Sequence, residues 1–318
     1  MNNKVHLKTK NGLGDKLLDV IGFYVLCKYL NYIPYVSFDN TGIFEWGNNI
    51  YDNELFNYNN IIITNNGNGC HYYMEAPNAS VSLCPYNVYL FLKKFFAGLT
   101  FEKIASDFSL YAKNIIKPSQ IISSKFPNGI ENAYGIHLRK SDKLKPNADI
   151  RHENLFHEFK IIINALLNDV KNIIIQEEEP VFLVVSEDDS WKNEIENIMY
   201  NIAKNNNKTI KILQIDYTNS KNYNNYKSVL DMFCLSKCKE ILQGVKNSNF
   251  SLLSSILGNG ELRNYSKHIN DNNKCIIVNA WSCVVNINGK KNYDISINEI
   301  VTNNFAKLNT NIDKIYDS

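Results

Sequence analysis

The chain has 318 residues, which is too long for one ordinary α/β core and suits two packed domains. Its 34 basic and 32 acidic side chains leave a formal net charge of +2, which argues against a nucleic-acid-binding protein with its basic stripe. The seven cysteines are scattered without Cys-x-x-Cys spacing, which favours reduced thiols over disulfides or a zinc site. We therefore expect a cytoplasmic protein with small ligands.

Membrane insertion and secretion are not indicated either. The first residues contain no apolar run of the signal-peptide kind, and no stretch of about 18 apolar residues occurs, the length that a transmembrane helix needs. We expect neither a signal peptide nor a transmembrane helix.

Residues 1–128 are expected to form an N-terminal α/β domain. A strand at 5–7 precedes a glycine turn and a helix that runs to about residue 30, with its apolar residues on one face. Further strands are expected at 35–38 and 61–63, and helices at 90–96 and 101–111.

A second domain is expected over residues 129–292, because the composition turns to Pro, Ser and Gly before a new strand begins at 133. Strands at 133–138, 181–185, 210–213, 240–242 and 275–278 alternate with helices at 153–170, 191–203, 227–238 and 250–257. This alternation predicts a parallel sheet covered on both faces. The expected fold class is α/β, with two Rossmann-like domains facing across a cleft, the second doubly wound, and a C-terminal helical tail at 293–318.

Four polar segments follow strands, where ligands bind to open α/β sheets. The first is the turn containing Gly12 and Gly14, which allows an anion to approach a helix N-terminus. A plain strand-to-helix turn explains it equally well. It is neither a dinucleotide fingerprint nor a P-loop, because it lacks the third glycine of the former and the Gly-Lys-Ser/Thr of the latter.

The second segment centres on Arg139. Strand alternation points His137 and Arg139 to the same side, and Lys140 and Lys143 continue the positive charge. A guanidinium fork binds two phosphate oxygens at once. The alternative is an exposed loop with ordinary ion pairs to Asp142.

The third segment, Ser186-Glu187-Asp188-Asp189, allows three interpretations: a metal-binding acidic pair, a cap for the following helix, or a ligand contact. The fourth, residues 244–249, ends in Ser248 and Asn249 at a predicted helix start.

These segments together resemble the fucosyltransferase superfamily, which includes α-1,6-fucosyltransferases, bacterial nodulation enzymes and protein O-fucosyltransferases. His-x-Arg-[basic]-x-Asp-Lys at 137–143 is similar to the arginine motif of that family. The Gly-x-Gly helix, the Ser-Glu-Asp-Asp strand end and Leu-Asp-x-x-x-Leu-Ser at 230–236 occur in the family's order.

The resemblance implies a GT-B fold and inverting transfer of L-fucose from GDP-fucose to a glycan hydroxyl, with no metal or other cofactor. It also implies that the acceptor binds mainly to the domain at 1–128 and the nucleotide sugar mainly to the domain at 129–292. It implies that His137 and Asp231 contact guanine and that Arg139 contacts the β-phosphate. The catalytic residues would be Arg139, Asp142 and Lys143. The donor-binding residues would be Gly12, Gly14, His137, Arg139, Asp188, Asp231, Ser248 and Asn249.

The chain departs from the α-1,6 pattern at Asn147, where the family has a glutamate that helps to deprotonate the acceptor. A neutral amide cannot act as a base, so Asp149, Glu153 or Asp15 would replace it, or the reaction would rely on departure of the leaving group. Two alternatives stay open: a transferase for GDP-mannose or a UDP- or dTDP-sugar, and a non-catalytic protein that binds a nucleotide sugar or glycan.

Overall fold

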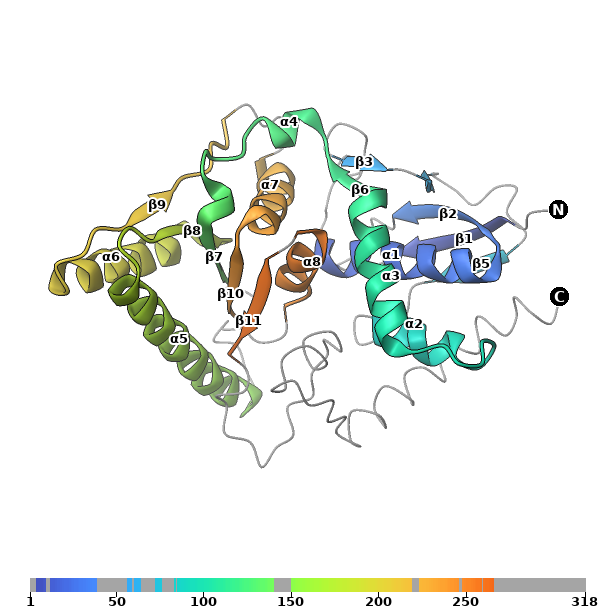
Figure 1. Cartoon of the computed structure of the whole chain (residues 1–318), viewed down its shortest axis with the longest axis horizontal. Coiled ribbons are helices and arrows are strands. Elements are labelled where there is room, and N and C mark those ends of the chain that lie inside the picture. Colours follow the sequence, from blue (N-terminus) through green and yellow to red (C-terminus); the bar gives the residue numbers. More distant parts are fainter. Residues whose placement is uncertain are drawn as a thin grey trace. The chain divides into compact units, whose positions relative to one another are not determined.

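The computed structural model describes residues 4–9, 12–38, 56–58, 60–63, 72–75, 83, 85–139, 150–218, 223–245, 248–258 and 260–265 (Figure 1). These residues belong to two compact units, divided between Ser123 and Ser124. The predicted strand at 275–278 and the predicted tail at 293–318 lie outside the described residues, so the domain limits stay predictions. The predicted cleft stays a prediction as well.

The first unit contains a four-stranded parallel sheet in the order β4-β2-β1-β5. Its strands are β1 (Lys4–Thr9), β2 (Ile33–Phe38), β4 (Ile62–Ile63) and β5 (Tyr72–Glu75). The short strands β3 (Phe56–Tyr58) and β6 (Ile116–Pro118) form a separate antiparallel pair. The helices are α1 (Leu13–Leu30), α2 (Pro85–Leu92), α3 (Phe101–Ile115) and α4 (Gln120–Ser123).

Helix α1 is buried on almost every side, so the expectation of a single apolar face is wrong. Its polar residues Lys16 and Asp19 are only 2% and 1% exposed. The helix packs on β1 and β2, and α2 and α3 pack against it in turn. A helix with neighbours on both sides has no solvent-facing stripe along most of its length.

The second unit contains a five-stranded, fully parallel sheet in the order β11-β10-β7-β8-β9. Its strands are β7 (Ala133–Leu138), β8 (Val181–Ser186), β9 (Lys211–Leu213), β10 (Glu240–Gly244) and β11 (Glu261–Asn264). Its helices are α5 (Ile150–Gln176), α6 (Asp189–Asn205), α7 (Tyr223–Lys237) and α8 (Asn249–Leu257), with a 3₁₀ turn at Ile130–Asn132. The sequence did not predict β11, whose exposed and half-buried residues give no apolar run.

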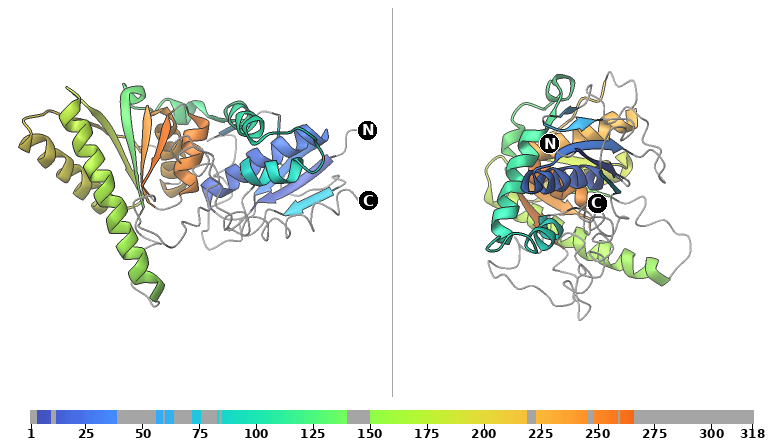
Figure 2. Two further views of the ribbon diagram at one scale, coloured as in Figure 1. Left: turned by 60° about the horizontal axis from the view of Figure 1, so that its bottom comes forward. Right: turned by 90° about the vertical axis from the view of Figure 1, so that its right-hand side faces the viewer.

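Helices cover both faces of this second sheet. Figures 1 and 2 show α5 and α6 on one side of the strands and α7 and α8 on the other. The core under α5 and α6 includes Ile136, Leu138, Leu166, Val184 and Leu242. The α/β fold class with two Rossmann-like units, the second doubly wound, is therefore confirmed.

Both sheets reverse their strand order once. In the second unit the first strand, β7, lies between β8 and β10, so the chain leaves β7 and β10 toward opposite faces. In the first unit β1 lies between β2 and β5 in the same way. Such a switch point opens a crevice at the carboxyl ends of the two strands, and ligands of open α/β sheets bind there.

Gly22 on α1 allows the segment at Leu83 to approach the helix. A Cβ added at Gly22 would lie 2.0 Å from the Leu83 carbonyl oxygen, and Asp19 Oδ1 accepts a 2.7 Å hydrogen bond from the Leu83 N–H. Glycine is therefore required at position 22 because the backbone of Leu83 leaves no room for a Cβ, and not because the helix backbone there has an unusual φ angle.

We predict that Gly22→Ala lowers the free energy of unfolding by about 1–3 kcal/mol, the usual cost of overpacking. Thermal unfolding of wild type and variant measures the change. Without the clash, alanine would stabilise a helix interior by about 1 kcal/mol relative to glycine, so a raised melting temperature would contradict this packing. Gly135→Ala is the control, because its nearest contacts are the Leu235 and Cys238 side chains, which can move, and we expect a smaller loss.

Candidate functional site

His137 lies at the carboxyl end of β7, on the face of the sheet that α8 covers. Its Nδ1 is 2.6 Å from Ser251 Oγ and 3.5 Å from Ser248 Oγ. Its ring packs on Phe250, with the centroids 4.9 Å apart. Burial, and then the charge of Arg139, lower the pKa of His137 to about 3. The imidazole is therefore neutral at pH 7, and acts as a hydrogen-bonding group rather than as a cation.

Ser248 is the N-cap residue of α8, and its hydroxyl accepts a 3.4 Å hydrogen bond from the Ser251 N–H. Asn249 is the first residue of that helix. The predicted pair Ser248 and Asn249 thus does stand at a helix N-terminus, where the macrodipole favours an anion. Because α8 follows β10, this N-terminus lies beside His137 at the switch point.

Gln243 is a site residue that the sequence analysis missed. It is opposite His137 in the β7–β10 register and is fully buried. Its Nε2 donates a 2.8 Å hydrogen bond to the Val245 carbonyl, while its Oε1 has no hydrogen-bond partner among the described residues. The available signal was a glutamine at the end of the apolar strand Ile241-Leu242, because a buried amide needs partners.

Arg139 follows directly after β7. Its Nε is 3.9 Å from Glu187 Oε2, and both side chains are about one-third exposed. An ion pair of this length and exposure contributes little to stability. The guanidinium follows the last residue of β7 and is therefore at the carboxyl end of the second sheet.

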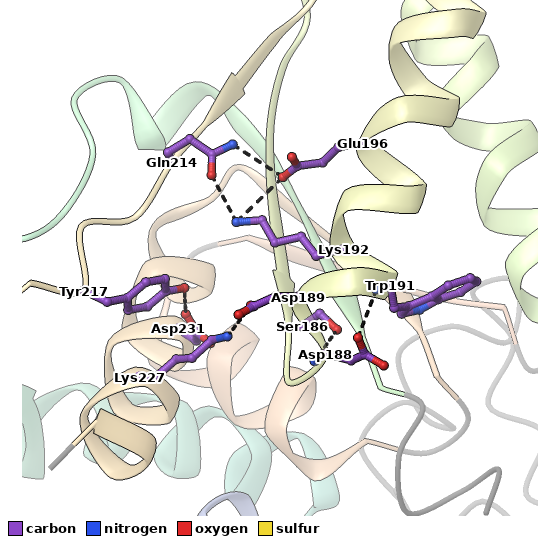
Figure 3. A network of polar contacts seen from close by, with 10 residues as sticks. All are labelled: Ser186, Asp188, Asp189, Trp191, Lys192, Glu196, Gln214, Tyr217, Lys227 and Asp231. Atoms are coloured by element: carbon purple, nitrogen blue, oxygen red, sulfur yellow. Dashed lines mark hydrogen bonds and ion pairs between the residues drawn. The ribbon is translucent and has the colours of Figure 1, made fainter.

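Asp188 caps helix α6. Its Oδ1 accepts a 3.0 Å hydrogen bond from the Trp191 N–H, and its own N–H donates to Ser186 Oγ at 3.1 Å (Figure 3). The capping interpretation of the acidic segment is therefore confirmed, and the contact of Asp188 with a donor stays a prediction. Within the described residues no three His, Cys, Asp or Glu side chains are grouped as metal ligands.

Asp231 is buried on α7, where the Tyr217 hydroxyl donates a hydrogen bond to its Oδ1 (Figure 3). Lys227 lies close by: its ammonium group is 2.7 Å from Asp189 Oδ1 and 5.4 Å from the centre of the Tyr217 ring. Tyr217 and Lys227 were not predicted as site residues. The resemblance implied that Asp231 and His137 both contact guanine. In the structure the two side chains have different hydrogen-bond partners, Tyr217 for Asp231 and Ser251 for His137.

The environment of Asp231 changes its acidity. Burial raises the pKa of this carboxyl to about 7, although the Tyr217 hydrogen bond and the charge of Lys227 lower it in part. The carboxyl group therefore changes its charge near neutral pH.

The other predicted residues are distributed differently. Asp142 and Lys143 lie outside the described residues, as do Asn147 and Asp149. Gly12 is the N-cap residue of α1 and Gly14 lies in its first turn, both in the first unit. The structure therefore leaves the assigned catalytic roles of Asp142 and Lys143 as predictions.

Comparisons with known proteins give a fold but no family assignment. No protein-family model matches the chain, and no curated protein matches it either. Among solved structures, the chain is similar to the fucosyltransferase NodZ from Bradyrhizobium, at 10% identity and a TM-score of 0.50, over 81% of this chain and 94% of that one. This likeness confirms the expected fold at the level of architecture.

Two further solved structures are similar at lower TM-scores. A mutant of FUT1 from Arabidopsis thaliana in complex with GDP is 11% identical, with a TM-score of 0.49, over 82% of this chain and 70% of that one. The α-1,6-fucosyltransferase NodZ soaked with GDP-fucose is 10% identical, with a TM-score of 0.47, over 81% of this chain and 93% of that one. Separately, none of the helices in the described ranges has the length and apolarity that a membrane span requires.

We predict a pH-dependent stability difference between wild type and Asp231→Asn. From pH 3.8, the ordinary aspartate pKa, to about 7, the native state holds a proton that the unfolded chain has lost. The wild type's free energy of unfolding therefore falls, relative to the variant's, by up to about 1.4 kcal/mol per pH unit as the pH rises through this range.

Urea unfolding of both proteins at pH 5, 6, 7 and 8 measures that difference. Asparagine keeps an oxygen that accepts the hydrogen bond from the Tyr217 hydroxyl. The difference between wild type and variant therefore reports the ionisation of the Asp231 carboxyl. A difference that is constant with pH would contradict the assigned environment of Asp231.

Proposed function

We propose that the chain is an inverting glycosyltransferase that transfers L-fucose from GDP-fucose to a glycan hydroxyl without a metal ion. The observation that carries this proposal is the position of Arg139 and the α8 N-terminus at the switch point of the second sheet. A guanidinium and a helix N-terminus at one crevice form a site for a diphosphate.

Leaving-group stabilisation is the chemistry that this arrangement supports. The bond between the anomeric carbon and the β-phosphate oxygen breaks, and its electrons pass to the diphosphate. Arg139 and the N-terminal turn of α8 at Ser248 would neutralise that charge, as a bound cation does in other transferases. The acceptor oxygen attacks the opposite face of the anomeric carbon and gives its proton to a carboxylate.

In the proposed donor site, Asp231 recognises the guanine base of GDP-fucose. An ionised carboxylate accepts hydrogen bonds from the N1–H and the 2-amino group of guanine, two donors that uracil does not present in this arrangement. His137 is neutral and supplies a further hydrogen-bonding group, consistent with the resemblance to fucosyltransferases. The fold shared with a fucosyltransferase supports the same class of donor without fixing its sugar.

The acceptor is expected on the first unit, where the Gly12 turn precedes the buried helix α1. Asp15 lies in the first turn of that helix and is one candidate for the base; Asp149 and Glu153 are the others. The described cysteines Cys27, Cys234 and Cys238 are free and buried, which agrees with a reducing, cytoplasmic location.

We predict that Arg139→Ala leaves the fold intact and lowers the turnover of GDP-fucose by about a hundredfold or more, the usual cost of removing one charge-stabilising donor. Arg139→Lys keeps the positive charge but loses the guanidinium's two parallel hydrogen bonds. Its activity should therefore lie between that of the wild type and that of Arg139→Ala. Arg263→Lys is the matched control, because Arg263 pairs with Asp169 and Glu240 elsewhere on the same sheet. Full activity of Arg139→Ala would refute the site.

We also predict that GDP and GDP-fucose raise the melting temperature, whereas UDP and UDP-sugars do not. GDP should bind more tightly as the pH rises through about 7, because only the ionised Asp231 offers both carboxylate oxygens as acceptors to the N1–H and the 2-amino group of guanine. Asp231→Asn should lose that pH dependence. Thermal shifts with GDP, GDP-fucose, GDP-mannose, UDP and UDP-sugars at pH 6 and 8 measure this, and donor hydrolysis separates an enzyme from a binding protein. Stabilisation by UDP alone would contradict the guanine assignment.

A further inference from the structure

A second concave site lies in the first unit, away from the glycine turn. It has a volume of about 560 Å³, which falls in the range of small-ligand sites. Its lining residues are Tyr24, Lys28, Asn60, Tyr111, Asn114 and Lys117. They come from the second half of α1, the end of α3 and the middle of β6, together with Asn60 shortly before β4. None of them belongs to the donor site described above.

The charge of this pocket is positive. The lining residues that the structure describes include two lysines and no acidic side chain. The nearest acidic side chain on α3, Asp107, is already bound by the Lys103 ammonium and the Tyr29 hydroxyl, the latter at 2.7 Å. An anion in the pocket would therefore meet two ammonium groups without a competing carboxylate from the helices that line it.

The aromatic residues give the pocket a floor. Tyr24 is buried, half-buried Tyr111 meets it edge to face at a centroid distance of 5.3 Å, and the Lys28 ammonium lies 5.4 Å from the centre of the Tyr24 ring. The two asparagines and Lys117 are exposed at the rim. Phenol and amide groups that donate and accept, next to ring carbons, suit the hydroxyls and C–H faces of a sugar.

We infer that this pocket binds an anionic sugar unit, one that carries a carboxylate or a phosphate, as a distal part of the acceptor glycan. That the ligand is a sugar rests on the proposed transferase function; the preference for an anion rests on the pocket alone. Tyr24 and Lys28 lie about 16 and about 22 Å along α1 from Leu13, at roughly 1.5 Å per residue. An extended oligosaccharide is needed to reach from the glycine turn to the pocket.

The test is calorimetric titration of the full chain without donor. The probes are a tetrasaccharide with one glucuronic acid, a neutral tetrasaccharide of equal length, and glucose 6-phosphate. We expect the acidic tetrasaccharide or the phosphosugar to bind at least about tenfold more tightly than the neutral one, since charge-assisted hydrogen bonds supply the difference. The tighter of the two charged probes identifies the anion. Equal binding of the charged and neutral probes, or no binding of any, would overturn the inference.

The variants Lys28→Gln and Lys117→Gln should each weaken the charged probe by about tenfold. Lys93→Gln is the matched control, because the exposed Lys93 ammonium lies 5.3 Å from the Tyr89 ring centre in the same geometry but does not line the pocket. An equal loss in Lys93→Gln would show a nonspecific charge effect and overturn the inference.

Thermal shifts with GDP, measured on the same variants, keep the two proposals apart. Binding of GDP without binding of the charged sugars removes only the pocket assignment. Binding of the charged sugars without GDP removes only the transferase proposal.

Discussion

The reversal of strand order between β7 and β10 is the constraint on which the proposed donor site depends. Because the connections leave these two strands toward opposite faces of the sheet, their carboxyl ends are not covered by one crossover helix. His137 from β7 and Ser248 and Ser251 from the start of α8 therefore meet at one crevice.

Burial determines what the polar groups around this crevice can do. His137 is kept neutral, so it adds no positive charge beside Arg139. Asp231, which is equally buried, changes charge near neutral pH, while Tyr217 and Lys227 fix its surroundings. Arg139 supplies a positive charge at the carboxyl end of β7, and a guanidinium fork suits a diphosphate better than a neutral ligand.

The first unit repeats the strand order of the second but differs in how its polar groups are used. Its central helix α1 is buried almost completely, with Asp19 anchoring the Leu83 segment and Gly22 allowing its approach. Exposed polar side chains, among them Lys28 near the end of α1, line a pocket of the first unit instead. A rigid helix thus connects the glycine turn with a separate cationic pocket.

The sequence by itself determined the elements and the polarity of the segments that follow them. Alternating strands and helices gave the two α/β units, and His137, Arg139 and Ser248 were placed at strand ends because periodicity and motif spacing are local properties. Asp188 stayed ambiguous, since capping depends on a backbone N–H that the sequence does not locate. Only the tertiary structure decided that Gln243 faces His137, that Tyr217 bonds Asp231, and that α1 is enclosed. Strand order, cross-strand register and burial arise from contacts between distant residues, and no local pattern encodes them.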